Sequence, residues 1–148
     1  MVTFHLLPLT LLLSFPAPVA TEIQAAFLQS SPAVLRQVLT DEGAIPVSLP
    51  EPLGLADQLS PDQTYLVFRR YFATFKTTEF TIDPLMSTLP GVSGGILKGR
   101  WSFRNERTGA TYSMRLYFFV APAGRPRPPG VEGPLVASRI VEIRAERR

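Results

Sequence analysis

The sequence contains no cysteine, and its only histidine is His5, near the start of the chain. Without cysteine, the protein cannot form disulfide bonds, thiolate metal sites or a lipid anchor on an N-terminal cysteine. Without a histidine after residue 5, a Ser-His-Asp triad, a Cys-His pair and a histidine-ligated zinc site are excluded from the rest of the chain. Any chemistry must therefore use carboxylates, tyrosine, lysine, arginine or the backbone.

Several motifs with a defined chemistry are also missing. No clustered acidic loop resembles a calcium-binding motif, and we expect no metal and no cofactor. The glycine-rich segment Gly91–Gly95 lacks the lysine and the strand-to-helix context of a phosphate-binding loop, and it is expected to be a plain turn. No dense basic run with interleaved aromatic residues is present, so we expect no nucleic-acid partner. We therefore assign no catalytic residue.

The charge is unevenly distributed along the chain, although the net charge is only +3. Residues 21–97 contain four basic and eight acidic residues, whereas residues 98–148 contain eleven basic and four acidic residues. Two interpretations are open: a basic face that binds an anionic partner, or an ordinary solvated face of a sheet. The sequence favours the second, because the basic residues form no dense run with interleaved aromatic side chains.

The length and composition indicate one packed domain preceded by an export signal. The chain has 148 residues, of which 45% are hydrophobic and 18% charged, which is apolar enough for a core. Residues 6–15 are apolar but too few to span a bilayer, and small residues follow them up to Ala20. We expect a signal peptide at residues 1–20 and a single domain at residues 21–148. The alternative is a buried or membrane-anchoring N-terminal segment.

We therefore predict an exported protein, periplasmic or extracellular, that is soluble after signal cleavage. No membrane contact is expected beyond the signal segment itself.

Three helices are predicted from residue spacing and capping signals. Two short ones cover residues 22–28 and about 32–39, the second after a Ser31 cap and Pro32, and such a pair suits a lid. A long helix at residues 60–76 begins with the Ser60-Pro61-Asp62-Gln63 capping signal. Its aromatic residues follow i, i+3, i+7 and i+10 and are expected to form one stripe against a sheet: Tyr65, Phe68, Phe72 and Phe75.

The remaining elements are predicted to be strands. Residues 44–49 form a short edge strand, because Pro46 and Pro50 limit pairing, and residues 50–59 form a loop. Residues 77–83, 96–104, 110–120 and 135–145 are strands, and residues 121–134 are a flexible loop rich in proline and glycine. In the last strand, Val141 and Ile143 favour one register and Ile140 favours the other.

Strict alternation in two strands predicts one packed and one solvated face. The expected inward residues are Leu97, Trp101, Phe103, Tyr112, Met114, Leu116, Phe118 and Val120. Arg115 and Tyr117 are expected to point outward, as are Lys98 and Arg100, and Asp83 is expected to point away from Phe80 and Ile82.

This order of elements resembles the nuclear transport factor 2-like, or cystatin-like, α+β cone. The stretches FLQSSPAVLRQVL, AIPVSL, SPDQTYLVFRRYFATFK and TTEFTID, followed by RLYFFV and SRIVEIRAE, resemble a family of small secreted bacterial proteins of unknown function. The resemblance covers about residues 22–145. It implies a curved antiparallel sheet of four to five strands packed on one long helix, with two short N-terminal helices and a pocket open at one end.

Some relatives in this superfamily, such as ketosteroid isomerases and polyketide cyclases, perform acid–base chemistry in that pocket, and others only bind ligands or partners. None of the expected inward residues is acidic, so the isomerase constellation does not map onto this sequence. The candidate pocket residues are the large inward side chains Tyr65, Phe68, Phe72, Trp101, Tyr112 and Met114, although packing in the core explains them as well.

The leading hypothesis is an exported, non-catalytic domain that binds a small apolar ligand or a protein partner, through the pocket or an exposed sheet face. One alternative is a small isomerase or dehydratase that uses Tyr and a carboxylate. The other is a structural or assembly domain that forms a homodimer through the sheet face.

Overall fold

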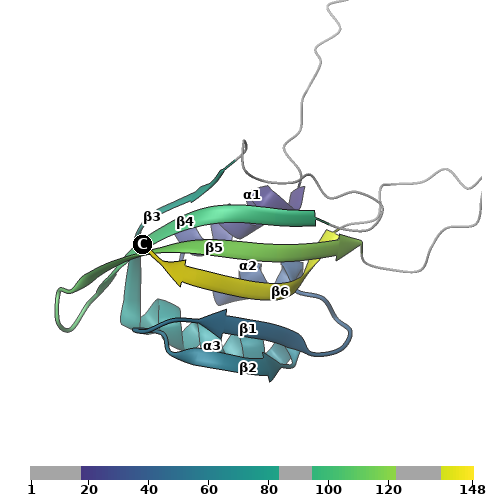
Figure 1. The fold of residues 1–148 in the computed structure, drawn as a ribbon, viewed down its shortest axis with the longest axis horizontal. Helices are drawn as coiled ribbons and strands as arrows, with labels where there is room; N and C mark the ends of the chain where they lie inside the picture. Colours follow the sequence, from purple (N-terminus) through teal and green to yellow (C-terminus); the bar gives the residue numbers. More distant parts are fainter. Residues whose placement is uncertain (1–17, 84–94, 123–137) are drawn as a thin grey trace, which may run out of the picture.

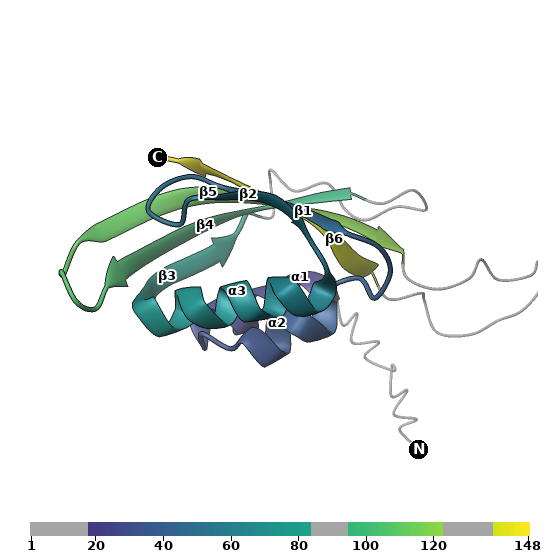
Figure 2. The same ribbon diagram turned by 90° about the horizontal axis from the view of Figure 1, so that it is seen from below.

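The structure is a computed structural model that describes residues 18–83, 95–122 and 138–148. Within these ranges, three helices cover one side of a curved sheet of six strands (Figures 1 and 2). The helices are α1 (Pro18–Leu28), α2 (Pro32–Val38) and α3 (Pro61–Thr74). The strands are β1 (Ile45–Leu49), β2 (Leu55–Leu59), β3 (Phe75–Ile82), β4 (Gly95–Asn105), β5 (Thr111–Pro122) and β6 (Ser138–Arg147).

The expected α+β cone is confirmed, with one more strand than the four to five expected and with mixed strand directions. The strand order is β2-β1-β6-β5-β4-β3, and the sheet is not closed. All neighbouring strands are antiparallel except β1 and β6, which run parallel and pair through Val47 and Ser48. The expectation that residues 44–49 form an edge strand is wrong, because β2 forms inside the segment expected to be a loop and covers β1 on its outer side.

Helices α2 and α3 begin and end where the flanking residues satisfy backbone groups. Ser31 caps α2, and its side-chain oxygen accepts a hydrogen bond from the backbone N–H of Val34 at 3.2 Å. At α3, Ser60 and Gln63 form the expected capping box. The backbone N–H of Gln63 donates to the Ser60 hydroxyl at 3.1 Å, and the backbone N–H of Ser60 donates to the Gln63 side-chain oxygen at 2.9 Å. The helix ends at Thr74, two residues earlier than expected, because Phe75 is already extended.

The core-facing residues of α3 differ from the expected aromatic stripe. The buried helix residues are Thr64, Phe68 and Phe72, spaced four apart, and Phe75 is the first residue of β3. Tyr65 therefore lies beside the buried stripe, half-exposed, rather than in it. The expected aromatic stripe is correct at Phe68 and Phe72. It is wrong at Tyr65, which lies beside the stripe, and Phe75 is buried but belongs to β3 and not to the helix.

A bulge resolves the ambiguous register of the last strand. Phe119 pairs with Glu142, whereas Val120 pairs with Ile140, so Val141 is an extra residue on β6. Because of this insertion, Ile140 and Ile143 both reach the core although they are three residues apart. Elsewhere in β4 and β5, the expected inward residues face the helices as predicted, with Tyr112 half-buried at the rim.

Three expectations concern residues outside the described ranges. The expected signal peptide covers residues 1–20, of which only residues 18–20 are described, and these form the first turn of α1 with Val19 buried. Of the expected turn at Gly91–Gly95 and the expected loop at residues 121–134, only Gly95, Ala121 and Pro122 are described, and they belong to β4 and β5 instead.

Candidate functional site

The space between the helices and the sheet is filled by aromatic side chains centred on Phe27 of α1. Phe27 is fully buried and stacks on Phe80, with ring centroids 4.4 Å apart. It also makes edge-to-face contacts, at centroid distances between 5.0 and 5.9 Å, with four further rings: Phe68, Phe72, Trp101 and Phe118. These distances lie within the range of favourable aromatic pairs, so the rings form packed core where the cone fold has room for a pocket.

The structure brings most of the sequence-predicted pocket residues together around this cluster. Phe68, Phe72, Trp101 and Met114 are buried, and Tyr112 stacks on Phe103 with ring centroids 5.5 Å apart. Tyr65 is separate from them, because it lies on the outer side of α3 with the Arg69 guanidinium 6.0 Å from its ring centroid. The six candidates therefore do not line one cavity together.

Polar groups are scarce in this interior. Within the described ranges, Thr64 is the only buried polar residue, and its hydroxyl donates to the Ser60 carbonyl at 2.9 Å. The Trp101 indole N–H donates to the Thr77 hydroxyl at 3.0 Å, which satisfies the one polar atom of that side chain. Acid–base chemistry of the isomerase type would need a carboxylate here, and the described carboxylates are all at least partly exposed.

Tyr71 is a half-buried hydroxyl at the edge of the core. It donates a hydrogen bond to the Leu53 carbonyl at 3.1 Å. Burial raises the pKa of Tyr71 above its ordinary value of 10.0, while the nearby Arg70 charge lowers it and the Glu51 charge raises it. A neutral tyrosine that ties α3 to the segment before β2 is a structural element rather than a general base at neutral pH.

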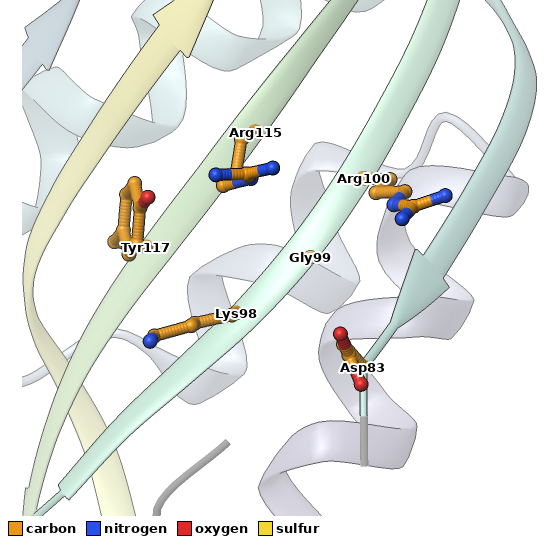
Figure 3. A pocket seen from close by; sticks show the side chains of 6 residues that line it. All are labelled: Asp83, Lys98, Gly99, Arg100, Arg115 and Tyr117. Carbon is orange, nitrogen blue, oxygen red and sulfur yellow. The ribbon is translucent and has the colours of Figure 1, made fainter. Parts of the chain in front are cut away.

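A polar concavity lies on the opposite face of the sheet. A hollow of about 250 Å³ is lined by Asp83, Lys98, Gly99, Arg100, Arg115 and Tyr117. Figure 3 shows these side chains on the near face of β4, β5 and the end of β3, with the helices behind the strands. We call this feature the outer hollow. It lies on the solvated side of the sheet that the alternation pattern predicts.

Strand register determines which charges are neighbours in the outer hollow. Arg100 of β4 is directly opposite Arg115 of β5, and Lys98 is directly opposite Tyr117. The backbone N–H of Asp83 donates to the Lys98 carbonyl at 2.8 Å, which holds the acidic residue beside the basic ones. The hollow therefore contains three cationic side chains and one carboxylate.

Within the described residues, no acidic side chain forms a salt bridge with either arginine of the outer hollow. Glu146 is opposite Arg115 on β6, but its carboxylate accepts a hydrogen bond from the Tyr117 hydroxyl at 3.2 Å. Thr81, not an acid, is opposite Arg100 on β3. Across the described part of the chain, neither Arg100 nor Arg115 has an ion-pair partner, whereas Arg104 pairs with Glu106 at 3.8 Å.

Sequence reasoning placed the outer-hollow residues correctly on the solvated face but did not select them as a site. Period-2 alternation shows that Lys98 and Arg100, and separately Arg115 and Tyr117, share a face. It does not show which residue of β4 is opposite which residue of β5, and this register is what brings two arginines together. The concentration of basic residues after residue 97 was the available signal.

No group of three or more acidic or histidine side chains comes together in the described ranges as a metal site would require. None of the described helices has the length and apolar composition needed to cross a bilayer.

Comparison with known proteins identifies the fold through structure alone. No protein-family model matches the sequence, and no curated protein matches it significantly. A ketosteroid isomerase-like protein from Erwinia carotovora atroseptica superposes with a TM-score of 0.64 at 13% identity, over 87% of this chain and 90% of that one. An NTF2-like protein of unknown function in nutrient uptake from Rhodospirillum rubrum superposes with a TM-score of 0.59 at 12% identity, over 88% of this chain and 95% of that one.

A third similar structure contains a bound small molecule. It is a hypothetical protein with a ketosteroid isomerase-like fold from Catenulispora acidiphila, in complex with trimethylamine, with a TM-score of 0.60 and 11% identity over 89% of this chain and 86% of that one. The described architecture and these similar structures define the fold class as an α+β cone. More specifically, the chain has the nuclear transport factor 2-like fold, as the resemblance in its sequence implied.

Proposed function

We propose that the protein is an exported, non-catalytic binding domain whose working surface is the outer face of the sheet. The observation that carries this proposal is the pair of contrasting faces. Phe27 and its ring neighbours fill the inner side with apolar atoms, while the outer side has a hollow lined by unpaired arginines. The fold supports the general class, because similar structures include a small-molecule complex and proteins described as isomerase-like.

The alternative function is acid–base catalysis of the isomerase type inside the cone. The likeness to a ketosteroid isomerase-like protein favours it. The described interior argues against it, because its only buried polar residue is Thr64, and a hydroxyl without a carboxylate or imidazole partner is a poor general base. An assembly role, in which two copies pair through the outer face, is the third candidate and would use the same surface.

Ligand mapping by NMR tests which face of the sheet binds a ligand. The single tryptophan, Trp101, is fully buried among the core rings, so its indole N–H resonance reports on the interior. Amides of Lys98, Arg100, Arg115 and Tyr117 report on the outer hollow. We expect ligands from a panel of small anions and apolar compounds to shift the outer amides and leave the indole resonance in place. A steroid or another apolar ligand that moves the indole resonance would contradict the proposal.

Two accompanying measurements separate the remaining alternatives. Incubation with a steroid that carries an isomerisable double bond should give no product above the buffer rate, and turnover would refute the non-catalytic part. Light scattering of the purified protein should show a monomer while the outer face is free for a ligand. A dimer that buries the amides of β4 and β5 would instead support the assembly role.

A further inference from the structure

The outer hollow has an excess of positive charge in a defined position. Lys98, Arg100 and Arg115 contribute three positive charges and Asp83 contributes one negative charge. We propose that the outer hollow binds the phosphate monoester group of a small molecule, with Arg100 and Arg115 as the two residues that grip it. The proposal rests on the outer face being the working surface and adds the chemical class of the ligand.

The cross-strand position of the two arginines favours one anionic group shared between them. Residues directly opposite each other in an antiparallel pair have Cβ atoms about 4.5–5.5 Å apart, and Arg100 and Arg115 have this relation. In Figure 3 both side chains lie on the same face of the neighbouring strands β4 and β5. Both are exposed, so their guanidinium groups can turn toward a common anion.

A phosphate monoester matches this arrangement better than a single carboxylate does. Guanidinium groups donate in a planar fork that suits both kinds of anion. A phosphate monoester has three terminal oxygens and a charge of about −1.5 to −2 near neutral pH, so it can accept hydrogen bonds from two forks at once and balance the charge of the hollow. A carboxylate has two oxygens and one charge, and a second guanidinium would stay partly unpaired.

The arginine pair is unfavourable for the sheet on its own. Like charges directly opposite each other on neighbouring strands destabilise the pairing, and within the described residues neither Arg100 nor Arg115 forms a salt bridge. Glu146 is opposite Arg115 but accepts a hydrogen bond from Tyr117, Thr81 opposite Arg100 is uncharged, and Asp83 in the same hollow supplies one negative charge against three positive ones. Departures from local stability rules are expected at functional sites. An anion bound between the two arginines would remove their mutual repulsion.

The size of the hollow limits the ligand. A volume of about 250 Å³ corresponds to roughly eight water molecules at about 30 Å³ each. That is enough for a phosphate group with a short carbon chain, and a larger ligand would extend beyond the hollow. The same phosphate monoester group is present in soluble metabolites and in the headgroup of phosphatidic acid, and the experiment must separate these sources.

Calorimetric titration of the purified protein with glycerol 3-phosphate tests the proposal. We expect binding that Arg100→Gln and Arg115→Gln each weaken about tenfold or more, as the loss of a charge-assisted bidentate contact requires. Arg107→Gln, in the exposed turn between β4 and β5, makes the same charge change away from the hollow and should leave the affinity unchanged. Succinate, with carboxylates only, should bind more weakly than glycerol 3-phosphate.

A second readout shows that the variants are folded and tests the repulsion argument. Without ligand, Arg100→Gln should melt at the same temperature as the parent protein or higher, because it removes a like-charge contact. Sedimentation with vesicles that contain phosphatidic acid covers the lipid source. Binding to these vesicles alone, lost in Arg100→Gln and retained in Arg107→Gln, would also support the site and assign its ligand to a lipid headgroup.

Three outcomes would overturn the phosphate assignment: no binding of either phosphate source, equal weakening by Arg107→Gln, or succinate binding as tight as glycerol 3-phosphate. If another ligand still shifts the outer-hollow amides in the NMR experiment, only the ligand class is wrong. If ligands move the Trp101 indole resonance instead, the proposed function itself fails.

Discussion

At the residue scale, Phe27 is the side chain on which the interior depends most. It contacts five other rings from its position at the end of α1. Phe27→Ala should lower the free energy of unfolding by about 3–5 kcal/mol, because it leaves a cavity in a rigid aromatic cluster. Urea denaturation measures this loss. The neighbouring Leu28 is 51% exposed, so Leu28→Ala is the matched control and should change stability by about 0.5 kcal/mol or less. Equal effects of the two variants would contradict the central position of Phe27.

Tyr71 gives a residue-scale prediction for the pH dependence of stability. Because burial raises its pKa, the folded state holds the phenolic proton more tightly than the unfolded state does. The resulting stabilisation is fully present below the ordinary pKa of 10.0 and is lost as the pH rises through the higher folded-state pKa. We expect the parent protein to lose stability above about pH 10 and Tyr71→Phe to lose less over the same range.

Chemical denaturation of both proteins at closely spaced pH values measures the difference. At neutral pH, Tyr71→Phe should be less stable by about 1 kcal/mol, because the hydrogen bond to the Leu53 carbonyl is lost. Parallel pH profiles for the two proteins would show that Tyr71 is not the titrating group.

The misplacement of Tyr65 shows what residue spacing can and cannot predict. Tyr65, Phe68, Phe72 and Phe75 fit a helical stripe over residues 60–76. The true stripe has Thr64 in place of Tyr65, because the buried residues of α3 are spaced four apart and Thr64 lies four residues before Phe68. A polar threonine gives no hydrophobic signal, although its hydroxyl is satisfied within the helix by the Ser60 carbonyl.

At the element scale, the start of α3 has the strongest local signal in the sequence. Both hydrogen bonds of the Ser60–Gln63 capping box are formed. Ser60→Ala should lower the free energy of unfolding by about 1 kcal/mol, because a backbone donor of the first turn loses its partner. Thermal or urea unfolding measures this cost. Ser48→Ala, at an exposed position of β1, provides the control and should change stability by about 0.5 kcal/mol or less. A cost that is the same for both serines would mean that the cap does not stabilise α3.

Element boundaries were predictable where local patterns are long, and not where pairing decides. β4 and β5 alternate over more than eight residues each, so their inward faces follow from sequence. β2 has only five residues, includes Asp57 and Gln58, and forms because β1 offers it a partner. The extra residue Val141 in β6 likewise depends on the register with β5, which the residues of β6 alone do not encode.

At the scale of the whole molecule, the order of elements was sufficient to predict the cone. The sequence patterns established which helix and which strands share the apolar side. The filling of the cone was not predictable, because Phe27 belongs to a short helix that resembles a lid. Its position against Phe80 and Trp101 is set by tertiary packing. The outer hollow likewise required strand register, which alternation alone does not supply.

Export is a whole-molecule prediction that the sequence makes and that a reporter can test. Residues 1–28 fused to a β-lactamase without its own signal should confer ampicillin resistance on a bacterial host, because the reporter acts only outside the cytoplasm. Leu12→Arg, which interrupts the apolar segment, should abolish resistance. Mass spectrometry of the released reporter would locate the cleavage site. Sensitivity of cells with the unmodified fusion would contradict the signal peptide.

Acrylamide quenching of the Trp101 fluorescence tests most directly whether the cone is filled. Trp101 is the only tryptophan and is fully buried among the rings of Phe27, Phe72 and Phe103. The account predicts a blue-shifted emission that acrylamide quenches only weakly until the protein is unfolded. Strong quenching of the native protein, close to that of the unfolded chain, would mean that solvent reaches the interior and would contradict the account.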